Sequence, residues 1–347
     1  AVLFSQDVVG VPHKLGMLVR VYGGRGQDWV NERQPTLFQG PAHGKIQDLT
    51  TSAMPNIPGF YSAVAAGQIN TVGPSGDDCM DLVLAGALQT APEIPNQVKP
   101  FKGRQDLVLL QDTSQDGDCL GTFIENVIPL GEPFEYTRDI KLADMDGDGI
   151  TDILAPCVHW PEPEPVLGAD HRSRIWLGVG NGEFHDASEL IPVAPELDGH
   201  ILLPCDIDGD GDQDLIEAGK RIIGQTPAVH TPRVFINQLD ETGVLAFGPD
   251  EGPERGMPTV YFVHDIACAG ILPERGPELL FARHQNSKNI LLENMGGGYF
   301  NDASDLLPNF PSDEPGFDHV HSLEWTQGVS MCKLENLEFP VIFYANG

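Results

Sequence analysis

The sequence predicts an all-β fold built from a tandem repeat. Short apolar segments that follow an acidic residue recur along the chain, at Asp81-Leu-Val-Leu-Ala, Asp152-Ile-Leu-Ala, Asp214-Leu-Ile-Glu-Ala, Glu278-Leu-Leu-Phe-Ala and Glu338-Phe-Pro-Val-Ile-Phe. The steps between them are 71, 62, 64 and 60 residues, and a fixed period of this size marks one repeated supersecondary element. The 39 glycines and 29 prolines are scattered, as expected of short strands joined by turns. We therefore expect five repeats in a single domain over residues 1–347.

Two of the repeats carry an acidic, glycine-punctuated loop that predicts a calcium site. Carboxylates at positions 1, 3, 5 and 9, with a further oxygen at position 7, converge on one point in such loops. The predicted ligands are Asp144, Asp146, Asp148, Ile150 through its carbonyl, and Asp152 in the first loop, and Asp206, Asp208, Asp210, Asp212 and Asp214 in the second. Without a cation each loop would hold several like charges close together, so we expect Ca²⁺ to contribute to folding.

The residues around the loops distinguish between families that use this pattern. An EF-hand needs a glutamate at position 12 on a following helix; the second loop offers Glu217 there, but the first has Ala155. The flanks, Ile-Lys-Leu-Ala before the first loop and Ile-Leu-Ala-Pro after it, predict short strands. A dockerin pair would be closer together than the 62 residues between Asp144 and Asp206. A strand, calcium loop and strand at this period instead resembles the FG-GAP/VCBS repeat of integrin-type β-propellers.

This resemblance implies a β-propeller with four-stranded blades. Further strands are expected at Arg174-Ile-Trp-Leu-Gly with Phe184, and at Asn289-Ile-Leu-Leu-Glu with Phe300; weaker versions are Asp106–Gln111 with Gly121–Ile124, and Arg233–Asn237 with Val244–Phe247. The expected blades span about 60–127, 134–188, 198–249, 259–304 and 318–347. Strands at Met17–Tyr22 and Pro35–Phe38, within residues 15–40, would complete the fifth blade and remove the last open sheet edges. The alternative is a six-bladed ring with a reduced blade at residues 1–40.

The other repeats lack the full set of calcium ligands, so two calcium sites are expected rather than five. The first repeat has Gln68 and Asn70 where the loop begins, and the fourth and fifth have Gly270 and Gln327.

Composition limits the partners and the compartment. With 20 Lys and Arg against 51 Asp and Glu the net charge is −31, which argues against nucleic acid and anionic membrane surfaces as partners. No apolar run approaches 18 residues, so no membrane insertion is expected. The start at Ala1 without Met, the six cysteines and the calcium loops favour a secreted protein, extracellular or periplasmic.

Cys79 and Cys119 are the expected disulfide pair; Cys268 with Cys332 is a second plausible pair, although spacing alone does not determine connectivity.

Histidines at one position of the repeat suggest a functional pocket. Six residues before the first loop position lie Ser62, Arg138, His200, His264 and His321, where first strands of a propeller enter its axial channel. His200, His264 and His321 could bind a catalytic transition metal, or one could act as a general acid or base while Arg138 holds an anionic group. Histidines that simply fill the channel are the alternative.

The function expected is binding of a glycan or another small ligand in this pocket. The alternative function is a metal- or His-dependent enzyme, either a lyase or hydratase or an oxidative enzyme.

Overall fold

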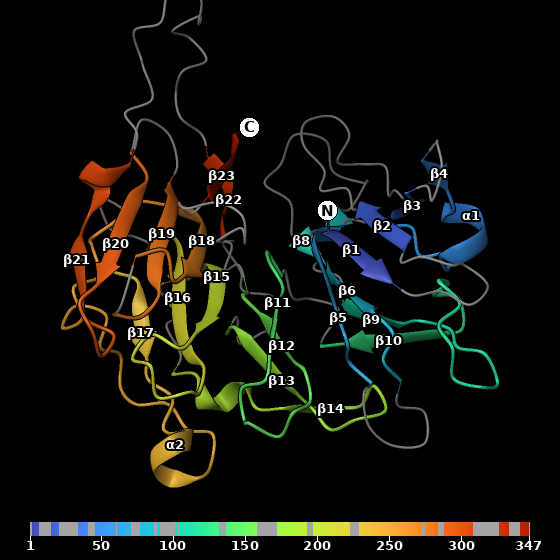
Figure 1. Cartoon of the computed structure of the whole chain (residues 1–347), viewed down its shortest axis with the longest axis horizontal. Coiled ribbons are helices and arrows are strands. Elements are labelled where there is room, and N and C mark those ends of the chain that lie inside the picture. Colours follow the sequence, from blue (N-terminus) through green and yellow to red (C-terminus); the bar gives the residue numbers. More distant parts are fainter. Residues whose placement is uncertain are drawn as a thin grey trace, which may run out of the picture. The chain divides into compact units, whose positions relative to one another are not determined.

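The computed structural model describes residues 2–6, 15–20, 34–40, 46–59, 61–70, 77–86, 89–90, 101–102, 105–131, 137–157, 172–192, 197–222, 229–272, 275–283, 288–307, 326–332 and 341–346. Strands dominate this part of the chain (Figure 1). Its helical elements are single short turns: α1 (Thr50–Ala53), α2 (Leu239–Thr242) and the 3₁₀ segments η2 (Ser188–Leu190) and η3 (Ser304–Leu306). The predicted all-β class is therefore confirmed. None of these helices is long and apolar enough to cross a bilayer.

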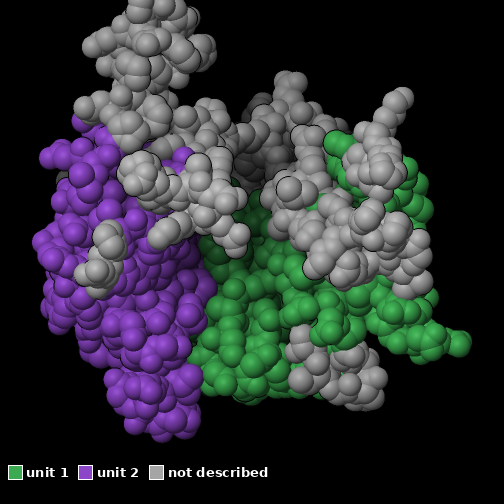
Figure 2. Space-filling view, in the orientation of Figure 1, with its two compact units in different colours: residues 1–193 green, residues 194–347 purple. Residues whose placement is uncertain are grey.

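The chain divides into two compact units, residues 1–193 and 194–347, coloured separately in Figure 2. Both units are built from antiparallel sheets whose strands come from consecutive parts of the chain. The boundary falls between the second and the third predicted repeat.

The first unit contains three four-stranded sheets and a short ribbon. The first sheet holds β1 (Val2–Gln6), β2 (Leu15–Arg20), β3 (Thr36–Gln39) and β4 (Gln47–Asp48). The second holds β5 (Tyr61–Gly67), β6 (Asp81–Gly86), β9 (Asp106–Leu110) and β10 (Asn126–Leu130), and the ribbon pairs β7 (Gln89–Thr90) with β8 (Phe101–Lys102). The third holds β11 (Lys141–Ala143), β12 (Asp152–Ala155), β13 (Arg174–Gly178) and β14 (Phe184–Asp186).

The second unit contains sheets of three, four and two strands. The first holds β15 (Leu197–Cys205), β16 (Asp214–Ile222) and β17 (Arg233–Phe235). The second holds β18 (Val263–Ala269), β19 (Glu278–Arg283), β20 (Ile290–Asn294) and β21 (Phe300–Asp302). The third pairs β22 (Thr326–Cys332) with β23 (Val341–Asn346).

Within each unit, consecutive sheets stack face to face. Because successive side chains of a strand point to opposite faces, a strand between two sheets must be apolar on both. In β6, Leu82 and Leu84 pack into a core shared with the β1–β4 sheet, while Val83 and Ala85 pack against the β11–β14 sheet. The second unit repeats this arrangement in β19. Leu279 and Phe281 face the β15–β17 sheet and Leu280 faces the β22–β23 sheet.

The first strands of consecutive sheets are also neighbours within each unit. β5 lies beside β1 and β11, and β18 lies beside β15 and β22. The burial pattern along β5 is identical to that along β18, with the first and fourth residues buried and the rest half-buried. Equivalent strands of different repeats therefore occupy equivalent environments.

The predicted second strands are confirmed at β6, β12, β16 and β19, and residues Glu338 to Pro340 of the fifth lie outside the described residues. Two predicted fourth strands are wrong. The fourth strand of the β5–β10 sheet is Asn126–Leu130, and residues 121–124 form a loop that buries Phe123. In the third repeat the predicted strand at residues 244–247 contributes only an isolated bridge between Asn237 and Phe247.

The expected completion of the fifth repeat by residues 15–40 also differs from the structure. One edge of β2 pairs with β1 and the other pairs with β3, so β2 has no free edge for a C-terminal strand. The strands β1 to β4 make a sheet of their own, in which β1 and β4 supply two strands that carry no acidic marker. The alternative, a six-bladed ring with a reduced blade at residues 1–40, stays a prediction; the observed sheet has four strands and extends to Asp48.

Candidate metal centres

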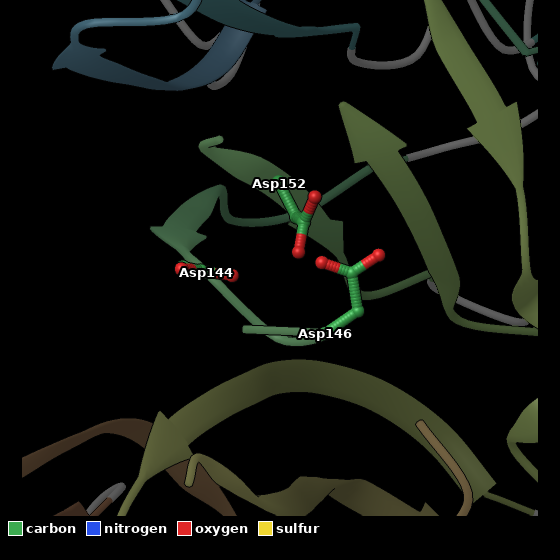
Figure 3. Close-up of side chains that lie close together, drawn as sticks. All are labelled: Asp144, Asp146 and Asp152. Carbon is green, nitrogen blue, oxygen red and sulfur yellow. The ribbon is translucent and has the colours of Figure 1, made fainter. Parts of the chain in front are cut away.

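The first acidic loop connects β11 to β12 and gathers three carboxylates. Asp144, Asp146 and Asp152 each offer one oxygen, and these oxygens lie within 4.8 Å of one another. Figure 3 shows the carboxylates of Asp146 and Asp152 turned toward each other. The loop folds this way because Gly147 N and Gly149 N donate to the two oxygens of Asp144, at 2.8 and 2.9 Å. Both glycines have positive φ, 74° and 84°, a conformation that side chains disfavour.

The second loop connects β15 to β16 and gathers three carboxylates as well. Here the oxygens within 4.8 Å of one another come from Asp206, Asp208 and Asp210. Gly209 N donates to Asp206 Oδ1 at 2.7 Å, as Gly147 does to Asp144 in the first loop. Both loops are flanked by strands, as predicted. Glu217 lies in β16 and accepts a 2.7 Å hydrogen bond from Arg233, so it takes no part in the second loop.

Not every predicted ligand joins these two groups. Asp148 is exposed, and its Oδ1 accepts the N–H of Ile150. Asp212 accepts the N–H of Asp240 through Oδ2. Asp214 accepts two main-chain N–H groups, described below, and Ile150 lies at position 7 with its side chain buried. The shared core of both sites is therefore the aspartates at positions 1 and 3.

Two buried carboxylate oxygens of the second loop indicate that this loop suits a cation. Asp208 Oδ1 and Asp212 Oδ1 are inaccessible to solvent and have no hydrogen-bond partner among the described residues. A carboxylate oxygen buried in this state is unfavourable unless a cation or a proton satisfies it. The donor set consists of carboxylate oxygens, which suits a hard cation such as Ca²⁺. The residues present therefore fit the ion that the sequence predicts.

The acid at position 9 has a second role, which is to fasten the sheet. Asp152 Oδ2 accepts Met145 N at 2.7 Å and Oδ1 accepts Gly178 N at 2.8 Å. Asp214 bonds to Ile207 N and Asn237 N in the same way. The same fastening occurs in the first repeat, where Asp81 accepts Ile69 N and Gln111 N, although that repeat lacks the calcium pattern.

The residue at the end of the third strand completes this fastening. In three repeats it is an amide side chain that donates to the carbonyl immediately before the acid. The bonds run from Gln111 to Met80, from Asn237 to Gln213 and from Asn294 to Pro277. These amides lie 17 to 31 residues from their partners, so no local sequence pattern predicts them. Only the acidic marker itself was visible as a repeated signal.

Burial affects the titration of these acids. Desolvation raises the pKa of Asp81, Asp152 and Asp214 to about 7, against the opposing effect of their main-chain hydrogen bonds. Burial, together with neighbouring carboxylates, also raises the pKa of Asp146 and Asp208. At Asp208 the nearby positive charge of Arg255 acts in the opposite direction. A bound divalent cation would favour the ionised form at both loops.

The structure brings two of the predicted pocket residues together. His200 in β15 is buried, and its ring contacts the ring of Phe262 with a centroid distance of 5.0 Å. His264 in β18 lies 4.2 Å from the same ring. His321 lies outside the described residues, and Arg138 belongs to the first unit, where its N–H donates to Pro156 O. In the described ranges, groups of three metal-ligating side chains occur at the two aspartate loops alone.

Two disulfides connect parts of the described chain. The predicted bond between Cys79 and Cys119 is confirmed. Cys268 bonds to Cys205 rather than to Cys332, so that second prediction is wrong. Cys205 lies in β15 and Cys268 in β18, and these neighbouring first strands bring the two Cα atoms to 6.3 Å. The bridge therefore joins the first and second sheets of the second unit.

Comparisons with known proteins add little to this description. No family model matches the chain, and no curated protein sequence matches it. Among solved structures, similarity is found to a lectin of Agrocybe aegerita described as recognising non-reducing terminal N-acetylglucosamine. The identity is 13%, the TM-score is 0.38, and the match covers 82% of this chain and 65% of the lectin, which is less than two thirds of its length. A similarity at this level assigns neither a family nor a ligand to this chain.

Proposed function

We propose that the protein is a secreted, calcium-stabilised β-propeller of the FG-GAP/VCBS type that binds a glycan or another small ligand. The observation that carries the calcium part is the pair of loops, each with three aspartate oxygens within 4.8 Å of one another. The buried, unpaired oxygens of Asp208 and Asp212 in the described structure add a specific need for a cation. The two disulfides agree with an oxidising compartment, where calcium is also abundant.

The propeller part of the proposal is supported by repetition at the level of hydrogen bonds. Strand order, stacked sheets and the fastening acid recur from repeat to repeat within both units. The described residues form six sheets, apart from the short β7–β8 ribbon, and this number favours a ring of six blades over one of five.

Metal analysis and calorimetric titration of the calcium-free protein test the calcium proposal. We expect about two Ca²⁺ per chain, in keeping with the two loops. Asp146→Asn should remove the first site and Asp208→Asn the second, because each substitution replaces a converging carboxylate with a weaker ligand. Asp116→Asn is the matched control, since Asp116 is an exposed acid of a different loop. Unchanged stoichiometry in both loop variants would overturn the proposal.

The glycan part rests on the family resemblance and on exposed aromatic rings. Tyr261 and Tyr299 are 48% and 53% exposed, and such rings can stack on the apolar face of a sugar. Binding to an array of glycans, measured with calcium and with chelator, tests this part. We expect binding that weakens on chelation and in a Tyr299→Ala variant. An absence of glycan binding by calcium-loaded protein would leave calcium stabilisation as the only supported function.

A further inference from the structure

One residue of the second acidic loop is held by another sheet. Ile207, at position 2 of the loop, is completely buried, and its N–H donates to Asp214. Its carbonyl accepts a 2.7 Å hydrogen bond from the buried side-chain amide of Asn294. Gly298 packs against its side chain so closely that an added Cβ would lie 3.1 Å from Ile207 Cγ1. Asn294 and Gly298 belong to the β20–β21 hairpin, which is part of the next sheet.

Arg255 contacts the same hairpin turn. This side chain is only 9% exposed, and its Nη1 donates to Gly297 O at 2.7 Å. The guanidinium also lies over the ring of Tyr299, 5.0 Å from the centroid, and Nε donates to Glu251 at 2.8 Å. The main chains of the two segments are also hydrogen-bonded, because Phe300 N donates to Arg255 O. Arg255 thus contacts the turn directly while its charge acts on Asp208 in the loop.

We propose that residues 294–300 and Arg255 form a latch that couples cation binding in the Asp206–Asp214 loop to the stability of the β18–β21 sheet. This inference rests on the proposed calcium function. A cation that draws the aspartates together orders the loop main chain, including the Ile207 carbonyl that Asn294 binds. The two effects are linked thermodynamically. If the latch stabilises the cation-binding conformation of the loop, it strengthens cation binding by the same factor by which the bound cation stabilises the latch.

Two glycine variants of the turn test the effect of the latch on binding. Gly298→Ala places a methyl group 2.5 Å from Arg255 Nη1 and 3.1 Å from Ile207. Gly297→Ala is the matched control: its φ is +62° against +72° at Gly298, but the nearest atom to its Cβ is Tyr299 Cδ2 at 3.9 Å. Both variants therefore carry similar backbone strain. Only one disturbs the contact with the loop.

Calcium titration should be made in a chain whose first loop is disabled by Asp144→Asn and Asp146→Asn. There we expect Gly298→Ala to weaken binding at the second loop by about tenfold, and Gly297→Ala by less than about twofold. Equal affinities in the two glycine variants would overturn the latch. Absence of calcium binding before either glycine is changed would instead overturn the proposed function.

Hydrogen exchange on the unsubstituted chain provides a test that does not depend on variants. Calcium should slow amide exchange in the loop at 206–214 and also at 294–302, since the latch transmits the ordering. Protection of the loop with unchanged exchange at 294–302 would refute the latch while leaving the calcium site intact. Asn294→Ala should uncouple the two segments, so that calcium protects the loop alone.

Discussion

The acid at position 9 anchors main-chain segments in three repeats, independently of the proposed cation binding. Asp81, Asp152 and Asp214 each begin a second strand, are completely buried, and accept main-chain N–H groups from two other segments. Asp81 does so in a repeat without the calcium pattern. The fastening role is therefore separable from the proposed cation binding, to which Asp152 would contribute together with Asp144 and Asp146.

At Asp81 the fastening role can be measured without interference from calcium. Asp81→Asn leaves one acceptor where two N–H groups point and turns an amide donor toward one of them. We expect a loss of about 1–3 kcal/mol in the free energy of unfolding, the cost of a buried unsatisfied group. Urea unfolding measures the loss, and calorimetry should show unchanged calcium stoichiometry. Asp78→Asn, which changes a nearby exposed side chain, should alter neither the free energy of unfolding nor the calcium stoichiometry. A lower calcium stoichiometry in the Asp81→Asn variant would contradict a purely structural role for Asp81.

At the scale of strands, the second strands are predictable from sequence because they are buried on both faces. The run Asp81–Gly86 has no exposed residue, so its apolar character is continuous and easy to see. The outer strand Asn126–Leu130 alternates little and has only one buried residue, which explains why the predicted fourth strand was placed too early. The N-terminal sheet was misassigned because the repeat was counted from the acidic marker, and β1–β4 have none.

The candidate sites were predictable for a similar reason. Aspartates at positions 1 and 3 act within one short loop, so local spacing was sufficient to predict them. Partners that reach the loop from another sheet, such as Asn294, depend on the packing of distant segments. No local pattern marks them.

The end of β13 offers a test at this scale. Gly178 occupies the place that an amide side chain takes in three other repeats, and an added Cβ would lie 2.6 Å from Thr151 O and 2.8 Å from Ile150 Cγ2. We expect Gly178→Ala to lower the free energy of unfolding by about 1–3 kcal/mol through overpacking. Thermal unfolding measures this. Calcium binding at the first loop should weaken too, because Ile150 and Thr151 belong to that loop.

Gly270→Ala provides the control for this substitution. Gly270 has no atom within 4 Å of an added Cβ, and its φ lies outside the left-handed range. Its replacement should therefore leave both stability and calcium binding unchanged. Equal effects of the two substitutions would show that the close approach at Gly178 is unimportant.

For the whole molecule, buried acids and a net charge of −31 make stability depend on pH in a defined direction. Burial raises the pKa of Asp81 from 3.8 to about 7, so between these values the folded state keeps a proton that the unfolded state has lost. The stabilisation is complete below about 4 and is lost as the pH rises to about 7. We therefore expect calcium-free protein to unfold at lower urea concentration at pH 7 than at pH 5.

Two controls separate the buried acid from general repulsion. Added salt screens exposed charges but acts little on a buried group, so the pH dependence due to Asp81 should persist at high ionic strength. Asp81→Asn should reduce the remaining slope without abolishing it, because Asp152 and Asp214 titrate in the same direction. A urea midpoint that rises steadily between pH 4 and pH 7 would contradict the prediction.

The connectivity of the disulfides has a consequence for biosynthesis. The bond between Cys79 and Cys119 closes within one meander, so it can form as soon as that segment has left the ribosome and reached an oxidising environment. The bond between Cys205 and Cys268 joins two separate meanders and requires both to have docked. Formation of this bond therefore indicates that the two meanders have docked correctly. Trapping free thiols at intervals during synthesis would reveal the order in which the two disulfides form.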